Sequence, residues 1–179
     1  MSSVETASAA QTSPFWTFSL GYYRGAGVSE ACLELQDNCG ADVNVVLFLL
    51  WQAAQRRSVA ADDVKSLAEK VRPWQVDVIG PIRAVRRRLK TDAPLIDKGA
   101  AELFRTKIKA IELEAERLQQ EAMQALAASL RSEPVETVEA AARANLAAYQ
   151  ATLGRTFTKA AAETMIAALH DDTGNRGTR

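Results

Sequence analysis

The residues best suited to do chemistry are five cations within one short segment, 83–90. They are Arg83, Arg86, Arg87, Arg88 and Lys90. On a helix, the apolar side chains of the same segment fall on the opposite side, so the cations share one polar face. Grouped guanidinium ions bind phosphates, nucleic acid or the acidic surface of a protein. They also occur as an ordinary solvated face, because cations are favoured near a helix C-terminus.

We expect the 83–90 segment to contact a protein partner, and nucleic acid is the disfavoured alternative. The chain carries 22 Lys and Arg against 22 Asp and Glu, so its net charge is zero. Polyanion binding depends on cations that neutralise phosphates, and the whole chain has no such bias. No aromatic or glycine-rich platform, on which bases stack, accompanies the segment.

A second group of polar residues lies nearer the N-terminus, in a region rich in aromatic residues. If the chain has a ligand pocket, its polar residues are expected to be Arg24, Asp37, Asp42, Asn44 and Gln52. The aromatic residues that could line it are Trp16, Trp51, Trp74, Tyr22, Tyr23 and Phe48. Aromatic residues at helical spacing more often pack in a core, so this pocket is one of two interpretations.

The carboxylates and the amide of this group also have structural interpretations. Asp37 and Asp42 are five residues apart, unlike the four-residue spacing of carboxylates that hold Mg²⁺ on facing helices. Asp42 suits the N-cap of the next helix, and Asp37 suits an ion pair with an arginine. Asn44 stands in an apolar run and needs hydrogen-bond partners if buried. We expect the backbone of a neighbouring loop, such as the turn at 25–27, to provide them.

The sequence contains no catalytic or metal-binding set. His170 is the single histidine, and Cys32 and Cys39 are the two cysteines. Seven residues on a helix separate these thiols by about 10 Å, too far for a disulfide. P-loop, dinucleotide-binding and zinc-protease motifs are missing. We therefore assign no catalytic residue, no metal and no cofactor, and we favour a protein that is not an enzyme. Reduced cysteines and an N-terminus without signal-peptide features indicate the cytoplasm.

The elements that must position these residues are helices. Segment 42–51 has eight apolar residues of ten. It is too short for a membrane span of about 20 residues, so it predicts a buried central helix and no membrane insertion. Apolar periodicity and helix boundary residues predict helices over 14–24, 28–39, 43–57, 58–90, 95–131, 134–153 and 156–170, and the 43–57 helix is the buried central one. Pro73 and Pro81 should kink the 58–90 segment or divide it into two or three short helices, and strand patterns are weak.

These patterns predict an all-α fold, a compact helical bundle of six or seven helices. A composition of 47% apolar and 25% charged residues is typical of globular proteins. We expect one domain over 13–170, with an aromatic-rich half at 13–90 and longer, alanine-rich helices at 95–170. Residues 1–12 and 171–179 are expected to be disordered ends.

The 95–131 helix carries a heptad-like apolar seam. Its members are Phe104, Ile108, Ile111, Ala115, Leu118, Ala122, Ala125 and Ser129. The seam predicts packing either against the following helix or against a second copy of the chain, as an isologous homodimer along 104–126.

Several short motifs together resemble a known family. Phe15-Trp16-x-Phe18-Ser19-Leu20-x-x-Tyr23 is followed by Gly27-Val28, Ala31-Cys32-Leu33, Leu35-Gln36-Asp37 and Gly40-x-Asp42-Val43-Asn44, then by Arg72-Pro73-Trp74, Pro81-Ile82-Arg83-x-Val85-Arg86-Arg87-x-Leu89-Lys90 and the 111–118 segment. Over about residues 14–125, the chain is similar to a proteobacterial family of small helical proteins catalogued only as a domain of unknown function. The resemblance implies a bacterial cytosolic protein and implies no reaction, cofactor or catalytic residue.

The function that the sequence favours is non-enzymatic. We expect a cytosolic helical adaptor or regulatory protein that binds a protein partner through the 83–90 segment and the 104–126 helix. Two alternatives stay open. One is a small helical enzyme or ligand carrier with a pocket among the first four helices, and the other is nucleic-acid binding through the 83–90 segment.

Overall fold

The computed structural model describes residues 13–90 and 96–174. Disordered ends are predicted at 1–12 and 171–179, and of these residues 1–12 and 175–179 lie outside the described residues. The last helix continues to Gly174, four residues beyond the predicted end at 170.

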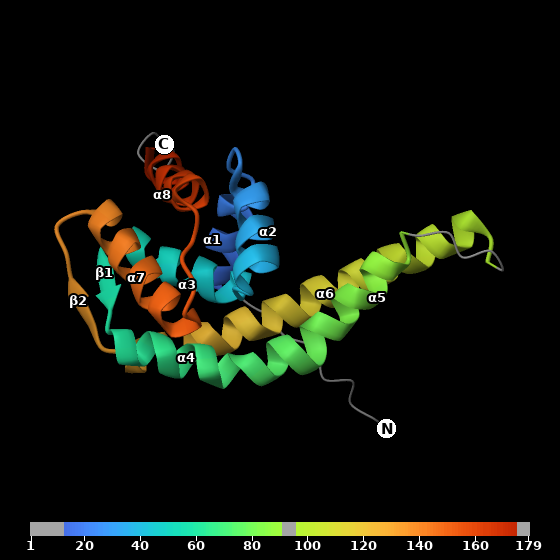
Figure 1. The fold of residues 1–179 in the computed structure, drawn as a ribbon, viewed down its shortest axis with the longest axis horizontal. Coiled ribbons are helices and arrows are strands. Elements are labelled where there is room, and N and C mark those ends of the chain that lie inside the picture. The colour runs from blue at the N-terminus through green and yellow to red at the C-terminus, as the bar shows by residue number, and fades with distance from the viewer. Residues whose placement is uncertain (1–12, 91–95, 175–179) are drawn as a thin grey trace, which may run out of the picture.

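The described part of the chain is helical apart from one small β-ribbon, so the predicted all-α fold is confirmed (Figure 1). The elements are α1 (Pro14–Tyr22), α2 (Val28–Cys39), α3 (Val43–Ala54), β1 (Arg57–Val59), α4 (Ala61–Trp74), the π-helix η1 (Gln75–Ile79), α5 (Gly80–Arg88), α6 (Lys98–Leu126), the 3₁₀ turn η2 (Ala127–Ser129), β2 (Ser132–Pro134), α7 (Val138–Leu153) and α8 (Lys159–Gly174). Helices α4, η1 and α5 follow one another without a break and count as one segment. The described residues of the chain then form seven continuous helical segments, within the predicted six or seven.

Helix α3 is the buried centre that the 42–51 segment predicts. All its residues from 44 to 50 are buried. The rings of Phe15 and Phe48 meet edge to face at 5.4 Å between centroids, and Phe15 stacks on Trp51 at 5.2 Å. Such aromatic pairs stabilise packing beyond the area that they bury. Helices α1, α6, α7 and α8 all contact α3, so α3 is the central helix of the core.

The β-ribbon was not predicted from the sequence. Strands β1 and β2 pair antiparallel over three residues each, too short for a recognisable alternation. The third predicted helix ends at Ala54 rather than 57, because Arg56 adopts a left-handed φ of 55° that turns the chain into β1. The ribbon joins the end of α3 to the segment before α7.

The prolines of the 58–90 segment are accommodated without breaking the helix. Pro73 lies inside α4, and Pro81 lies at the start of α5. A proline removes one N–H donor and clashes with the preceding turn. The π-helical turn between them, η1, widens the helix at this point, as such insertions often do. The predicted succession of short helices is therefore one continuous run with a π segment.

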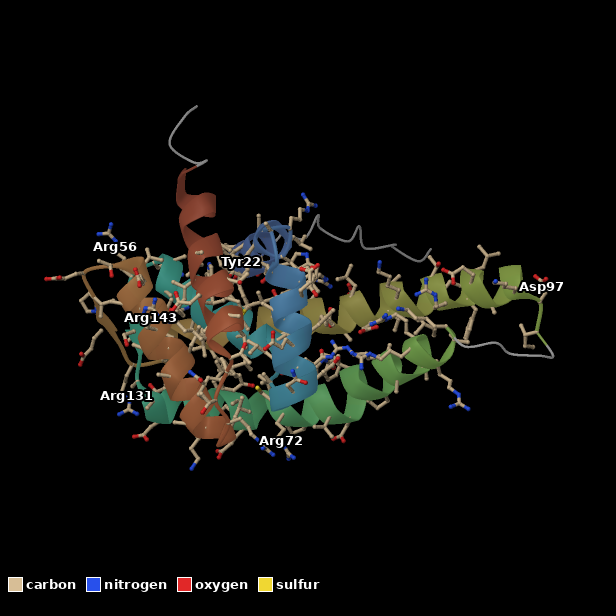
Figure 2. All side chains as sticks on the ribbon, turned by 45° about the horizontal axis from the view of Figure 1, so that its top comes forward. Tyr22, Arg56, Arg72, Asp97, Arg131 and Arg143 are labelled. Atoms are coloured by element: carbon tan, nitrogen blue, oxygen red, sulfur yellow. The ribbon has the colours of Figure 1, made fainter. Side chains whose placement is uncertain are left out.

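Helices α5 and α6 form a hairpin that projects from the rest of the molecule (Figure 1). Asp97 caps α6 by accepting a hydrogen bond from the backbone N of Ala100 at 2.9 Å. Figure 2 shows Asp97 at the outer end of this hairpin and Arg131 at the opposite end of the molecule. No helix of segments 13–90 and 96–174 has both the length and the apolar character needed to cross a membrane.

Helix α6 does not bury its apolar seam against the following helix, which was one of the two predicted arrangements. Its expected apolar seam is largely exposed, with Phe104 at 51%, Ile111 at 52% and Leu118 at 43%. The buried face is instead mostly polar and comprises Glu112, Ala115, Gln119, Gln120 and Met123. The helix packs on α1, α3, α4 and α5. Three polar residues of α6, Glu112, Gln119 and Gln120, therefore face the protein interior, and most of the predicted apolar seam faces outward.

Candidate functional site

A cavity of about 400 Å³ lies between α1, α2 and α3 on one side and the α5/α6 hairpin on the other. We call it the cavity. Its lining residues are Trp16, Ser19, Leu20, Tyr23, Arg24, Cys32, Leu33, Gln36, Val43, Asn44, Leu47, Arg83, Arg86, Arg87, Lys109, Glu112, Leu113, Glu116 and Gln120. The size is typical of small-molecule sites, which occupy about 300–1,000 Å³.

The exposure of the lining residues divides the cavity into a mouth and an inner wall. The mouth is formed by exposed residues, namely Leu20, Tyr23, Arg24, Leu33, Arg87, Lys109 and Leu113. The inner wall is formed by buried residues, namely Ser19, Cys32, Asn44, Leu47, Glu112 and Gln120. The mouth therefore combines apolar side chains with cations, and the inner wall combines apolar side chains with amides and a hydroxyl.

An arginine–glutamate network crosses one wall of the cavity, between α5 and α6. Arg83 Nε lies 2.8 Å from Glu112 Oε1, and Arg83 Nη2 lies 2.6 Å from Glu116 Oε1. Arg83 also donates to Gln36 on α2, and Arg86 donates to both oxygens of Glu112. The side chain of Glu112 is only 7% exposed, so this carboxylate depends on its two arginines to offset the cost of burial.

The local sequence explains why these groups meet. Arg83 and Arg86 are three residues apart on α5, and Glu112 and Glu116 are four apart on α6, so each pair shares one helix face. The chain reverses direction between α5 and α6 and brings the two faces together. Nitrogen and oxygen atoms accordingly gather between α2 and the hairpin (Figure 2).

The two carboxylates of the network differ in acidity. Burial opposes ionisation of Glu112, but the hydrogen bonds from Arg86 and Arg83 leave its pKa below the ordinary value. For Glu116, burial outweighs the attraction of Arg83 and raises the pKa. Burial also raises the pKa of the Cys32 thiol to about 12, so this thiol is neutral and a poor nucleophile at neutral pH.

A chain of amides forms part of the inner wall, and we call it the amide chain. Gln120 Nε2 donates to Asn44 Oδ1 at 2.8 Å, and Asn44 Nδ2 donates to Gln119 Oε1 at 2.7 Å. Gln119 Nε2 then donates to Asp42 Oδ2 at 2.6 Å. Asp42 Oδ1 caps α3 by accepting from the backbone N of Asn44 at 2.9 Å. The chain thus begins at a carboxylate and ends at Gln120.

Two buried polar atoms on cavity-lining residues, Ser19 Oγ and Gln120 Oε1, have no hydrogen-bond partner among the described residues. Ser19 is 3% exposed and Gln120 is 2% exposed. Buried polar groups are nearly always paired, so an unpaired one needs a reason. Gln52 Nε2 and Gln75 Oε1 are also unpaired, but neither residue lines the cavity. Of these four residues, Ser19 and Gln120 line the cavity, so a ligand bound there lies next to these two side chains and could complete the bonding.

The predicted pocket residues are partly brought together. Arg24 and Asn44 line the cavity, and Asp42 lies behind its wall as the first member of the amide chain. Asp37 lies at the rim, where its Oδ1 is 3.2 Å from Arg87 Nη2. Gln52 is the exception, because it lies about two helical turns beyond Asn44 on α3 and does not line the cavity. The prediction that Asn44 bonds the backbone at 25–27 is wrong, since its side chain bonds α6.

The basic segment 83–90 does not form a uniform solvent-facing patch. Arg83 and Arg86 turn toward α6, with side chains only 15% and 21% exposed. Arg87, Arg88 and Lys90 are exposed, and Arg87 lies beside Asp37. The expectation of a single solvated face is corrected because the reversal of the chain places two carboxylates of α6 opposite the first two arginines.

Sequence reasoning missed the contribution of α6. Lys109, Glu112, Leu113, Glu116 and Gln120 all line the cavity. None of these residues belongs to the apolar seam predicted for this helix. The signal that could have identified them is a polar stripe at helical spacing, 112, 116, 119 and 120, on a helix next to one with closely spaced arginines. Among the predicted aromatic residues, Trp16 and Tyr23 do line the cavity.

The described residues hold no cluster of three or more His, Cys, Asp or Glu side chains that could bind a metal ion. The geometry thus defines a helical protein with one amphipathic cavity walled by an arginine–glutamate network. The chain belongs to the family described as a protein of unknown function, DUF2390, whose model matches residues 14–123. All residues that line the cavity fall within this matched segment. No curated protein and no solved structure matched the chain.

Proposed function

We propose that this protein binds a small organic anion with an apolar body in the cavity. The observation that carries the proposal is the composition of the lining. Its cations are Arg24, Arg83, Arg86, Arg87 and Lys109, and its carboxylates are Glu112 and Glu116, an excess of three positive charges. The walls are otherwise largely apolar, and two buried polar atoms there have no partner. This combination is that of a ligand site, with apolar walls and a few polar groups that fix orientation.

The cations divide into those that build the wall and those that can meet a ligand. Arg83 is engaged by Glu112, Glu116 and Gln36, so it holds the wall together. Arg24 and Lys109 are exposed at the mouth. The anionic group of the ligand therefore binds at the mouth, where cations attract it and water still solvates it.

The apolar body of the ligand packs against side chains that the fold leaves exposed. Leu20, Tyr23, Leu33 and Leu113 are between 39% and 48% exposed at the mouth, and Trp16 lies behind them. Exposed apolar side chains grouped around a cavity are typical of ligand-binding grooves. A ligand that covers them gains the free energy of burying both surfaces.

Binding rather than catalysis is the function that these groups support best. The cavity thiol, Cys32, is held neutral by burial, and Glu112 is neutralised by two arginines. Cys32 and Cys39 are both free, which supports a reducing, cytoplasmic location and agrees with the bacterial cytosolic protein that the resemblance implies.

A fluorescence titration tests the proposal. Anilinonaphthalene sulfonate is an apolar anion of suitable size, and its emission rises when it leaves water. We expect saturable, one-site binding to the folded protein that weakens as salt is added. We also expect quenching or a shift of tryptophan emission, because Trp16 lines the cavity.

Two matched variants locate the binding. Leu33→Glu places a negative charge at the mouth, on a side chain that is 48% exposed, so folding should be unaffected. Leu103→Glu makes the same change on a 70% exposed side chain of α6 that does not line the cavity. We expect Leu33→Glu to weaken binding by about tenfold, near 1.4 kcal/mol, and Leu103→Glu to have no effect. Equal effects of the two variants, or no saturable binding at all, would overturn the proposal.

The second proposal concerns the outward face of the hairpin, and it continues the expectation of a protein partner. The large apolar side chains exposed on α6 and its neighbours are Trp74, Val76, Val85, Ile96, Leu103, Phe104, Ile111 and Leu118. Among them, Phe104, Ile111 and Leu118 are seven residues apart and share one face of α6, and an exposed apolar face of this kind is typical of a protein contact. We propose a second copy of the chain as the partner, arranged antiparallel along α6.

Charge complementarity supports this choice of partner. Phe104 and Leu118 each lie seven residues from Ile111, so in an antiparallel pair centred on Ile111 each faces the other on the second copy. In that register Lys107 of one copy comes close to Glu114 of the other, and the same contact occurs twice.

Sedimentation at increasing protein concentration tests whether the chain forms this dimer. Ile111→Glu should shift the protein to monomer, whereas Leu33→Glu should not. A wild-type protein that stays monomeric at about 100 μM would reject the dimer, whose Kd must then lie well above that concentration.

The exposed end of the 83–90 segment supports a nucleic-acid role less well. Two of its five cations are already bound to carboxylates of α6. Phosphate binding would have to displace these contacts or rely on the remaining side chains.

A further inference from the structure

The amide chain gives the inner wall of the cavity a defined polarity. Both oxygens of Asp42 accept hydrogen bonds, Oδ1 from the backbone N of Asn44 and Oδ2 from Gln119 Nε2, so Gln119 turns its amide N–H₂ group toward Asp42. The oxygen of Gln119 then faces Asn44, which must donate to it. The oxygen of Asn44 in turn faces Gln120, which must donate to Asn44. Each step fixes the next.

The fixed direction of the amide chain determines which atom of its last member, Gln120, stays unpaired. Because the Nε2 group of Gln120 is committed to Asn44, the remaining atom is the acceptor Oε1. This is the atom that has no hydrogen-bond partner among the described residues. Gln120 is 2% exposed and lines the cavity. The acceptor role of Asp42 therefore decides, through three amides, that the end of the amide chain presents an acceptor rather than a donor.

We infer that the ligand of the cavity carries an N–H or O–H donor at its inner end, which binds Gln120 Oε1, in addition to an anionic group at its outer end. This inference rests on the proposed function and names the ligand class more closely. The ligand is a compact apolar, ring-sized body with a carboxylate, sulfonate or phosphate at one end and a neutral hydrogen-bond donor at the other.

The position of the donor explains why it should matter for selectivity. A site with a buried polar group discriminates strongly against a ligand that leaves this group unpaired. At Gln120, bulk water does not reach the unpaired oxygen. A ligand without a donor would seal this acceptor inside an apolar contact, whereas a ligand with a donor would complete the amide chain.

The experiment compares two probes of nearly the same shape and charge. Indole-3-acetate, the carboxylate abbreviated as indolyl acetate, has a ring N–H donor, and the carboxylate 1-benzothiophene-3-acetate has a ring sulfur at the same place. Affinity is measured by competition with anilinonaphthalene sulfonate. We expect the wild type to prefer indolyl acetate by about tenfold or more, as for one hydrogen bond to a buried acceptor. Equal affinity of the two probes would overturn the inference but leave the proposed function intact. If neither probe displaces the fluorophore, the inference falls, whereas the proposed function falls only if the fluorophore itself shows no saturable binding.

Two variants separate the mechanism from general damage to the site. Asp42→Asn keeps an oxygen to cap α3 but adds an N–H₂ group, so the amide chain no longer has a fixed direction. We expect the preference for indolyl acetate to shrink several-fold. Gln120→Leu removes the acceptor, and the two probes should then bind about equally. Gln52→Leu is the matched control, because Gln52 is buried on α3 but lies outside the cavity. It should keep the wild-type preference. Loss of the preference in this control as well, or its retention in Gln120→Leu, would refute the assignment of Gln120.

Discussion

Two buried asparagines, Asn44 of α3 and Asn145 of α7, differ in where their hydrogen bonds end. Asn145 of α7 is fully buried and accepts from the backbone N of Val59 at 2.8 Å. It donates to the backbone oxygens of Leu49 and Arg57, each at 3.0 Å. Asn44 is also buried, but both groups of its side chain bond other side chains, and the chain that they form ends at the cavity.

The difference separates a structural amide from one with a role in binding. Every hydrogen bond of the Asn145 side chain ends on the backbone. This residue therefore links β1 to α3 and α7 and leaves no side-chain group for a ligand. The bonds of Asn44 pass through Gln119 and Gln120 and leave one acceptor open. The number of hydrogen bonds is similar in both places. What differs is whether the network closes on itself or ends at a space that a ligand can fill.

The largest expected effect is on the closed network. Asn145→Ala would leave one backbone N–H and two backbone oxygens without their partner, so we expect a loss of about 3 kcal/mol in the free energy of unfolding. Urea denaturation followed by circular dichroism measures it. Binding of the fluorophore by the folded variant should be unchanged. A loss below about 1 kcal/mol would show that water replaces Asn145 easily, and the contrast with Asn44 would fail.

The arginine–glutamate network lies between the two cases, because it both holds the hairpin and lines the cavity. Arg83→Met removes the partner of Glu116 and one partner of the buried Glu112. We expect a loss of about 2 kcal/mol, less than for a fully buried pair since Arg83 retains some contact with water. Arg87→Met is the control. Both side chains of its ion pair with Asp37 are about half exposed, so a loss below about 0.5 kcal/mol is expected. Equal losses in the two variants would contradict the structural role of Arg83.

A smaller effect, with a definite sign, concerns the carboxylate that starts the amide chain. Burial raises the pKa of Asp42, although hydrogen bonds from Gln119 and Asn44 oppose this. Between the ordinary pKa of 3.8 and the raised value, the folded state binds the proton more tightly than the unfolded state. The stability of the wild type should therefore fall as pH rises through this interval. Asp42→Asn should lack this component, so the difference in unfolding free energy between wild type and variant should decrease as pH rises. A difference that grows with pH would show that the hydrogen bonds dominate.

The sequence was sufficient to predict the fold class and most helices, because these depend on local signals. Helix α2 begins and ends where the pattern of Val28 to Cys39 predicts, and Gly40 takes the left-handed φ of 65° that such an end favours. The buried run of α3 followed from its composition alone. The β-ribbon did not, because its strands are short and the two segments are far apart in the sequence.

The candidate site was predictable only in part, for a reason visible in α6. Its polar residues read as a solvated face and its apolar residues as a core seam, since periodicity gives the two faces but not which one is covered. The tertiary arrangement reverses the expected assignment by placing Arg83 and Arg86 against Glu112 and Glu116. Arg24 and Asn44 were identified because they are polar residues next to aromatic or apolar runs. Gln120 was not identified, because no neighbouring residue in the sequence distinguishes it from the other glutamines of α6.

The smallest expected change tests the other unpaired atom of the inner wall. Ser19 Oγ is buried and has no hydrogen-bond partner among the described residues, so Ser19→Ala removes a polar group that gains little in the free protein. Replacing such a group with an apolar one of similar shape is close to neutral, and we expect a change in unfolding free energy within about 0.5 kcal/mol. Thr17→Ala is a useful comparison on the same helix. Its hydroxyl donates to the backbone oxygen of Ser13 at 3.1 Å but is exposed, so it should also change stability little. Only Ser19→Ala should alter affinity for the fluorophore or the acetates, because only Ser19 lines the cavity. A loss of more than about 1 kcal/mol on Ser19→Ala would mean that water already completes the bonding of this hydroxyl, and the open network would then be reduced to Gln120.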